Sequence, residues 1–295
     1  MGRLRMPAEF ATHDGTVIAW PCRDEIYPGA LMDEARDAHA ELARTISRYE
    51  PVWMIAAPRD AELAAERCGS TVDVVELPID DSWFRDSGPI YVFDGTERIA
   101  LDFTFNGWGE KFAPWDQDDA IAAKWAAYAG HPSRKVPMVF EGGSITVDGA
   151  GTGATTTQCL MHPNRNPGLT HTEIEDQVCD ALGLDAVVWL PYGLALDDDT
   201  DGHVDNVACF TEPGTLLVQG CDDPTEDDLW ILPTLAAAYA EPEVDRLADA
   251  KRIADLILTL DPDFSVAEQV ALLPYKVPEQ ARRAAAAMRR AGLPD

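Results

Sequence analysis

Short runs of alternating apolar and polar residues cover most of this chain, and turn-forming residues separate one run from the next. In three places, two such runs flank a turn rich in Gly, Asp or Pro, which is typical of β-hairpins. The three turns are Asp94–Thr96, Asp148–Gly151 and Glu212–Gly214. Each hairpin directly follows one of three polar motifs: Trp83–Pro89, Glu141–Ser144 and Gly202–Asn206. The near-constant spacing of these motifs indicates a repeated supersecondary unit.

Helix-like and strand-like patterns fill the chain between the motifs. The longest covers about residues 31–49 and places five apolar residues on one helix face: Leu31, Ala35, Ala38, Leu42 and Ile46. Shorter patterns predict helices at about 59–68, 118–130 and 172–182. Strands are predicted at about 16–20, 52–56, 72–77, 99–105, 136–140 and 186–190. Strands interleaved with helices predict an α/β fold.

The pattern changes after residue 220. An acidic turn at 222–228 carries helix-start residues, and the chain beyond it is rich in Ala, Leu, Arg and Asp. Helices are predicted at about 229–239, 242–258 and 278–291. We therefore divide the chain into one α/β domain, 1–224, and a helical segment, 225–295, which we expect to pack on the same domain.

Composition and charge narrow the range of functions. The chain has 295 residues, 46% of them hydrophobic, and a net charge of −29. Such a surface repels nucleic acid and anionic membranes but suits a small cation. The N-terminus has no apolar signal core, which favours a cytoplasmic protein. The six cysteines are scattered without metal-binding spacing, so we expect small buried thiols.

The three motifs also carry the candidate chemistry. Repeats arranged about an axis would bring Asp86, Glu141, His203 and Asp205 together, and three acids with one imidazole form a site for a cation. His203 and Asp205 are two positions apart, so in a strand both side chains would point the same way. An aspartate beside a histidine raises its pKa and orients its ring. Glycoside hydrolysis by two carboxylates remains open, but it does not account for the His–Asp pair.

Several longer motifs resemble one known family. They are Pro7–Phe10, Ala19–Pro21, Asp80–Pro89, Phe105–Gly109, Glu141–Gly143, Gln158–Leu160, Asn164–Pro167 and Asp199–Asn206. Together they resemble the agmatine deiminase and bacterial-type peptidyl-arginine deiminase family of the pentein, or guanidino-group-modifying, superfamily. The resemblance covers about residues 6–224.

This resemblance implies a five-bladed pentein-type α/β propeller that hydrolyses a guanidinium group to a ureido group and ammonia. Asp86 and Asp205 would hold the guanidinium nitrogens by charge-assisted hydrogen bonds. Glu141 and His203 would transfer protons, and Asp199 and Trp83 would lie along the substrate. The resemblance implies no metal and no organic cofactor.

The family's attacking cysteine lies in a C-terminal Gly-Gly-Gly-Asn-x-His-Cys segment, which this sequence lacks. The last blade is therefore expected to be incomplete or replaced by helices. A deiminase would need a thiol from Cys209, Cys221 or another chain. The alternatives are an impaired guanidinium-binding homologue, a homo-oligomer or subunit completed by a partner chain, and a truncated gene product. Agmatine, peptidyl arginine and other guanidines stay open, and we expect Trp108 and Trp115 near the substrate's distal end.

Overall fold

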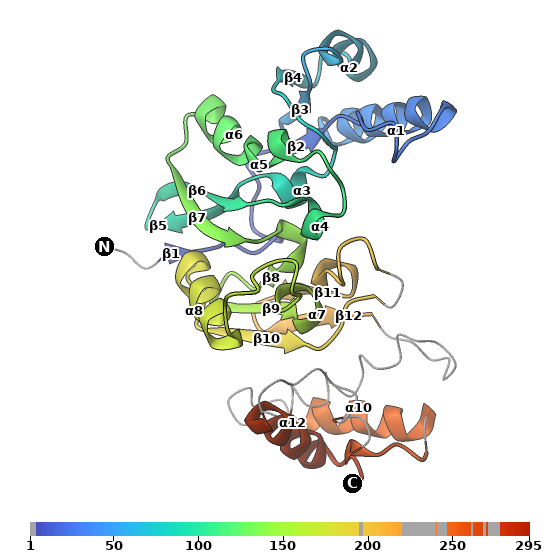
Figure 1. The fold of residues 1–295 in the computed structure, drawn as a ribbon, viewed down its shortest axis with the longest axis vertical. Helices are drawn as coiled ribbons and strands as arrows, with labels where there is room; N and C mark the ends of the chain where they lie inside the picture. The colour runs from blue at the N-terminus through green and yellow to red at the C-terminus, as the bar shows by residue number, and fades with distance from the viewer. Residues whose placement is uncertain are drawn as a thin grey trace.

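Three α/β units follow one another along the chain in the computed structural model (Figure 1). The structure describes residues 4–194, 197–219, 240, 247–260, 262–267, 270 and 278–295. The acidic turn at 222–228, the predicted helix at 229–239, residues 242–246 of the next predicted helix and Cys221 lie outside the described residues. The described strands form four separate sheets.

The first unit is a parallel three-stranded sheet with two helices. Its elements are β2 (Thr16–Ala19), α1 (Ala30–Ile46), β3 (Val52–Ala56), α2 (Ala61–Cys68) and β4 (Asp73–Glu76). The strand order is β2-β3-β4. The expected apolar face of α1 is wrong, because Leu31 and Leu42 are about half exposed. The small residues Ala40 and Ala43 are buried instead, since they let the helix approach the sheet closely.

The second unit is a four-stranded sheet in the order β1-β5-β6-β7. Its elements are β1 (Leu4–Arg5), β5 (Ile90–Asp94), β6 (Glu97–Thr104), α6 (Ile121–Ala129) and β7 (Ser133–Val139). The β5–β6 hairpin is antiparallel, and β7 runs parallel to β6 after the helical crossover. The predicted helix at 118–130 is thus two elements, a short α5 (Asp116–Asp119) followed by α6.

The third unit repeats this order of hairpin, helix and parallel strand. Its elements are β8 (Thr146–Val147), β9 (Thr152–Thr156), α8 (His171–Leu182) and β10 (Ala186–Leu190), and a final hairpin follows, β11 (Ala208–Glu212) with β12 (Thr215–Val218). Strand β9 pairs antiparallel with β8 and parallel with β10. This recurrence confirms the repeat that the motif spacing predicts.

Short turns carry the polar motifs. They are α3 (Phe84–Ser87), α4 (Gly107–Glu110), α7 (Thr157–Leu160) and the 3₁₀ turns η1 (Gly142–Ser144) and η2 (Val204–Asn206). Turns α3 and η1 contact each other, as do η1 and η2. The three motifs therefore meet, although residue 86 and residue 203 lie far apart in sequence.

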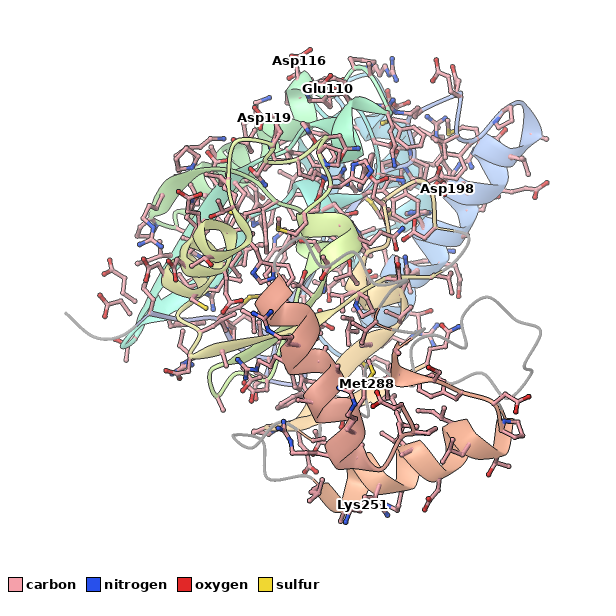
Figure 2. The ribbon with its side chains drawn as sticks, turned by 60° about the horizontal axis from the view of Figure 1, so that its bottom comes forward. Glu110, Asp116, Asp119, Asp198, Lys251 and Met288 are labelled. Atoms are coloured by element: carbon pink, nitrogen blue, oxygen red, sulfur yellow. The ribbon has the colours of Figure 1, made fainter. Side chains whose placement is uncertain are left out.

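The described C-terminal elements are two helices, α10 (Leu247–Leu260) and α12 (Pro278–Ala291). Buried residues of both helices belong to one hydrophobic cluster with residues of β11 such as Phe210. Met288 of α12 is fully buried, whereas Lys251 of α10 is exposed at the outer edge of the molecule (Figure 2). The bounds of α12 match the prediction, and the described residues of the helix predicted at 242–258 lie in α10.

A buried carboxylate fixes the loop that leads into α3. Asp118, 2% exposed, accepts the backbone N–H of Asp80 at 2.9 Å. The Asp80 carboxylate accepts the backbone N–H of Gln117 at 2.8 Å in return. Burial raises the pKa of Asp118 from 3.8 to about 7. The protonated carboxyl is therefore favoured in the folded chain over a wide range of pH.

This raised pKa predicts that the folded chain loses stability as the pH rises from about 4 to about 7. The unfolded chain releases the proton of Asp118 at a lower pH than the folded chain, so the free energy of unfolding falls by up to about 4 kcal/mol. Asp118→Asn should flatten this part of the pH profile, measured by urea unfolding. The exposed Asp116→Asn is the matched control, and a profile equally steep in Asp118→Asn would contradict the assignment.

Candidate functional site

Three predicted site residues converge on Gly143 in η1. A Cβ atom at this position would lie closer than 3.0 Å to His203 Nδ1, 2.8 Å from Asp86 Oδ1 and 2.9 Å from Asp205 Oδ2. Only glycine leaves room for all three side chains here. The backbone N–H of Gly143 also donates to Asp86 Oδ1 at 2.8 Å. The polar motifs thus build one site, as their spacing predicts.

A tryptophan holds the other oxygen of Asp86. The indole Nε1 of Trp108 donates to Asp86 Oδ2 at 3.1 Å, and both side chains are buried. Trp108 has a φ of +54°, a left-handed conformation that costs free energy in a bulky residue. Trp108 is thus tied to Asp86 through its indole N–H, and the expected place of Trp108 and Trp115 near the distal end of a substrate stays a prediction.

Glu141 lies in a fully buried ion network. The Nε of Arg165 donates to Glu141 Oε1 at 2.6 Å, and neither side chain is exposed to solvent. Arg165 also donates to Asp201 Oδ2 at 2.8 Å and to the carbonyl of Thr200 at 3.0 Å. Burial raises the pKa of Glu141, but His203 and the Arg165 charge together hold it below its usual 4.5. Glu141 is thus ionised at neutral pH.

Asp197 positions His203 through the backbone. Its Oδ2 accepts the N–H of His203 at 3.1 Å and the side-chain N–H of Asn206 at 2.9 Å. These bonds fold residues 204–206 into the turn η2 rather than the strand that would place His203 and Asp205 on one side. His203 is consequently buried, whereas Asp205 is exposed. The two nevertheless meet at Gly143.

The two edges of the His203 ring face different groups. Nδ1 lies 3.7 Å from Asp86 Oδ1, and Nε2 lies 3.8 Å from Glu141 Oε2. Burial disfavours the imidazolium, but Asp86, the Cys159 thiol and Glu141 raise the pKa of His203 well above its usual 6.5. These neighbours therefore favour the imidazolium form of His203.

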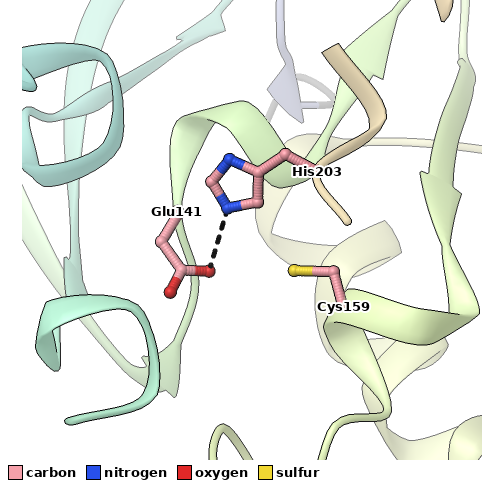
Figure 3. Close-up of side chains that lie close together, drawn as sticks. All are labelled: Glu141, Cys159 and His203. Atoms are coloured by element: carbon pink, nitrogen blue, oxygen red, sulfur yellow. Dashed lines mark ion pairs between the residues drawn. The ribbon is translucent and has the colours of Figure 1, made fainter. Parts of the chain in front are cut away.

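The cysteine beside these residues is Cys159, which lies in the short helix α7. Its Sγ, His203 Nε2 and a Glu141 carboxylate oxygen lie within 4.8 Å of one another (Figure 3). Cys159 is fully buried, and burial raises the pKa of its thiol. The other described candidate, Cys209, lies on β11 opposite Leu217. The structure therefore assigns to Cys159 the place beside Glu141 and His203.

Two predicted substrate-contacting residues, Trp83 and Asp199, are exposed at the surface. Trp83 is 50% exposed just before α3. Asp199 is exposed, and its carbonyl oxygen accepts Nζ of Lys111 at 3.3 Å. Their roles along a substrate stay predictions.

Comparisons with known proteins agree with this geometry. Residues 5–255 match the family model of the Porphyromonas-type peptidyl-arginine deiminases. The chain belongs to this family. It is 42% identical over 237 residues to the agmatine deiminase of Medicago truncatula, a match that covers 76% of the chain and 63% of that protein.

Solved structures of the deiminase family share the fold. The agmatine deiminase of Enterococcus faecalis superposes with a TM-score of 0.71 at 34% identity, over 76% of this chain and 62% of that one. A Cys-to-Ser variant of the C. jejuni agmatine deiminase with substrate bound gives 0.72 at 28% identity, over 79% and 69%. The chain thus spans less than two thirds of the length of the M. truncatula and E. faecalis relatives.

The predicted fold class is confirmed as the pentein-type α/β propeller of these deiminases. Among the described residues no sheet closes on itself, and the last strand is β12. No described helix is both long enough and apolar enough to cross a lipid bilayer.

Three site residues of this deiminase-family chain escaped prediction from the sequence, Cys159, Arg165 and Asp201, as did the bond from Trp108 to Asp86. Each lies within or directly beside a motif that carries the family resemblance, but only the fold shows which partner its side chain meets. Of these residues, Arg165 was the easiest to predict from the sequence. It lies in the motif Asn164–Pro167 of a very acidic chain, and an arginine in that position is expected to pair with a carboxylate.

The buried ion network predicts a large loss of stability in Arg165→Met. Glu141 would keep a buried charge without its partner, which costs about 3–5 kcal/mol of unfolding free energy. Arg134→Met on the exposed part of β7 is the matched control and should change stability by less than about 0.5 kcal/mol. Urea unfolding measures both, and the Glu141→Gln/Arg165→Met double variant should recover part of the loss. Equal effects of the two single variants would refute the role of Arg165.

The crowding at Gly143 predicts that Gly143→Ala forces Asp86, His203 and Asp205 apart. If this site binds agmatine, that binding should weaken at least about tenfold, measured by calorimetry, which corresponds to about 1.4 kcal/mol. Gly168→Ala, where an added Cβ meets nothing within 4 Å, is the control. Unchanged binding in Gly143→Ala would show that the three groups do not act together on a ligand.

Proposed function

We propose that this chain is an agmatine deiminase-like hydrolase, which converts a guanidinium group and water into a ureido group and ammonium. The observation that carries the proposal is the convergence of Asp86, His203 and Asp205 at Gly143, with Glu141 behind the imidazole. Two carboxylates beside one protonated imidazole suit a planar cation that must lose one nitrogen.

The carboxylates would hold the substrate. Asp205 is exposed and can accept guanidinium N–H groups from a ligand that enters from solvent. Asp86 is fixed by Gly143 and Trp108, so its remaining lone pairs are already oriented. Charge-assisted bonds of this kind give both affinity and orientation.

The buried pair would move the protons. A thiol attacks the guanidinium carbon, the C–N bond to one terminal nitrogen breaks, and water later displaces the sulfur. The leaving nitrogen needs a proton, which the imidazolium form of His203 carries. Glu141 stays ionised behind the ring and stabilises the His203 imidazolium until His203 donates this proton.

Cys159 is the described thiol nearest to this chemistry, but its burial and raised pKa favour a second function. A thiol that stays protonated is a weak nucleophile. The second candidate is therefore a protein that binds guanidino compounds without turnover. The amine end of agmatine suits the acidic character of the chain, while arginyl peptides and free arginine share the same guanidinium group.

Ammonia release from agmatine by the purified chain tests the proposal. Turnover that iodoacetamide, Cys159→Ser and Asp86→Asn each abolish would support hydrolysis with Cys159 as the nucleophile. If Cys209→Ser abolished turnover instead, the nucleophile would be Cys209 on β11. Calorimetric binding without turnover would support the guanidinium-binding function.

The proposed roles of Asp86 and Asp205 predict how far their substitution weakens agmatine binding. Asp86→Asn and Asp205→Asn should each weaken agmatine binding about 10- to 150-fold, because each removes a charge-assisted hydrogen bond of about 1.5–3 kcal/mol. Asp73→Asn on exposed β4 removes the same charge elsewhere and should bind normally. If all three variants bind agmatine like the parent chain, the proposed site is wrong.

A further inference from the structure

Two buried polar atoms of the site have no hydrogen-bond partner. They are Glu141 Oε2 and His203 Nε2, whose side chains are at most 3% exposed. Both face the space in front of the Cys159 thiol (Figure 3). The two atoms face each other at 3.8 Å as an ion pair, and with the Cys159 thiol beside them they leave room for one ligand that all three groups could share.

We propose that Glu141, Cys159 and His203 form a binding site for a zinc ion. The three side chains supply one carboxylate oxygen, one thiolate and one imidazole nitrogen, a donor set that suits zinc better than calcium or magnesium. Their donor atoms lie within 4.8 Å of one another, and Glu141 Oε2 lies 3.8 Å from His203 Nε2. Ligands at zinc bond lengths of about 2.0–2.3 Å lie about 3.3–3.8 Å apart, so a small contraction completes the site.

The groups around the triad are those of a metal site. Arg165 holds the second oxygen of Glu141 at 2.6 Å, which leaves Oε2 aimed at the triad. Asp86 lies 3.7 Å from the second nitrogen of His203 and favours a proton there, so Nε2 is the nitrogen left for a metal. Carboxylates behind a ligating histidine commonly orient the ring in this way. The backbone N–H of Cys159 donates to Thr156 Oγ1 at 3.2 Å and fixes the start of α7.

Charge also fits a dication. Zinc binding would release the thiol proton and one imidazolium proton to solvent, leaving one carboxylate, one thiolate and one neutral imidazole around the metal. The triad with zinc has no net charge, which suits a site that solvent does not reach. A fourth coordination position would remain for water or a small anion.

This zinc site could not be predicted from the sequence, because its three ligands come from three different parts of the chain. Glu141 precedes η1, Cys159 lies in α7 and His203 precedes η2. No pair of them has the short spacing of a local zinc motif. The site is also distinct from the carboxylates that face Gly143, because it uses the opposite edge of the His203 ring.

If the proposed hydrolysis is correct, zinc would inhibit it. The metal takes the atoms of Glu141 and His203 that proton transfer needs, while Asp86 and Asp205 stay free to hold a guanidinium. Zinc binding itself does not depend on turnover, so the two proposals can fail separately.

Cobalt substitution tests the site in the full chain. Protein freed of metal by chelation is titrated with Co²⁺, and one equivalent should produce a near-ultraviolet thiolate-to-cobalt absorption band that Zn²⁺ abolishes. Cys159→Ser should lose the band, whereas the matched control Cys179→Ser on α8 should keep it. Glu141→Gln should keep the band and weaken zinc binding at least tenfold.

X-ray absorption of the unsubstituted chain, purified from zinc-supplemented medium, covers the case in which Cys159→Ser does not fold. One sulfur at about 2.3 Å with nitrogen and oxygen neighbours at about 2.0 Å is expected. A shell without sulfur, a shell with two sulfurs, a cobalt band that survives in Cys159→Ser, or no metal bound at all would overturn the proposal.

Discussion

The contact between Arg165 and Glu141 is the constraint on which the site depends. Both side chains are fully buried, and a buried charge is tolerated only when it is paired and hydrogen-bonded. Arg165 meets this requirement with one guanidinium that reaches Glu141, Asp201 and the carbonyl of Thr200. The planar fork of an arginine can serve these acceptors together, which the single ammonium of a lysine cannot do.

The same network joins loops that belong to different repeats. A Cβ at Gly109 in α4 would collide with Asn164 and Arg165, so the loop that carries Trp108 packs directly on the arginine. Lys111 continues this contact, because its Nζ binds Asp201 Oδ1 at 2.5 Å. Arg165 therefore links Glu141 to Asp201 and Lys111, and the loop whose Trp108 holds Asp86 packs on the same guanidinium.

The sequence predicted the elements well where periodic patterns decide them. The hairpins, their helical crossovers and the convergence of Asp86, Glu141 and His203 follow from motifs that recur at a steady spacing. Prediction failed where tertiary contacts decide which residues are buried. Ala40 and Ala43, rather than the larger Leu31 and Leu42, form the buried face of α1, because close approach to the sheet outweighs hydrophobicity.

The same limit explains the missed site residues. Cys159 looks like any small core thiol in the sequence, and only the fold puts it beside Glu141 and His203. The turn η2 arises because Asp197 accepts several N–H groups at once, which a period-two pattern cannot reveal. Cytoplasmic location, the division into an α/β domain and a helical C-terminal segment, and a homo-oligomer or completing partner chain stay predictions.

The position of Asp86 has a thermodynamic consequence for any cation bound beside it. The imidazolium of His203 and a bound guanidinium would both draw on the negative charge of this one carboxylate. A ligand cation that neutralises Asp86 must therefore loosen the proton on His203, and a tightly held proton must in turn weaken the ligand. Proton release and ligand uptake are linked equilibria of a single acceptor, so acidification and ligand compete for the same site.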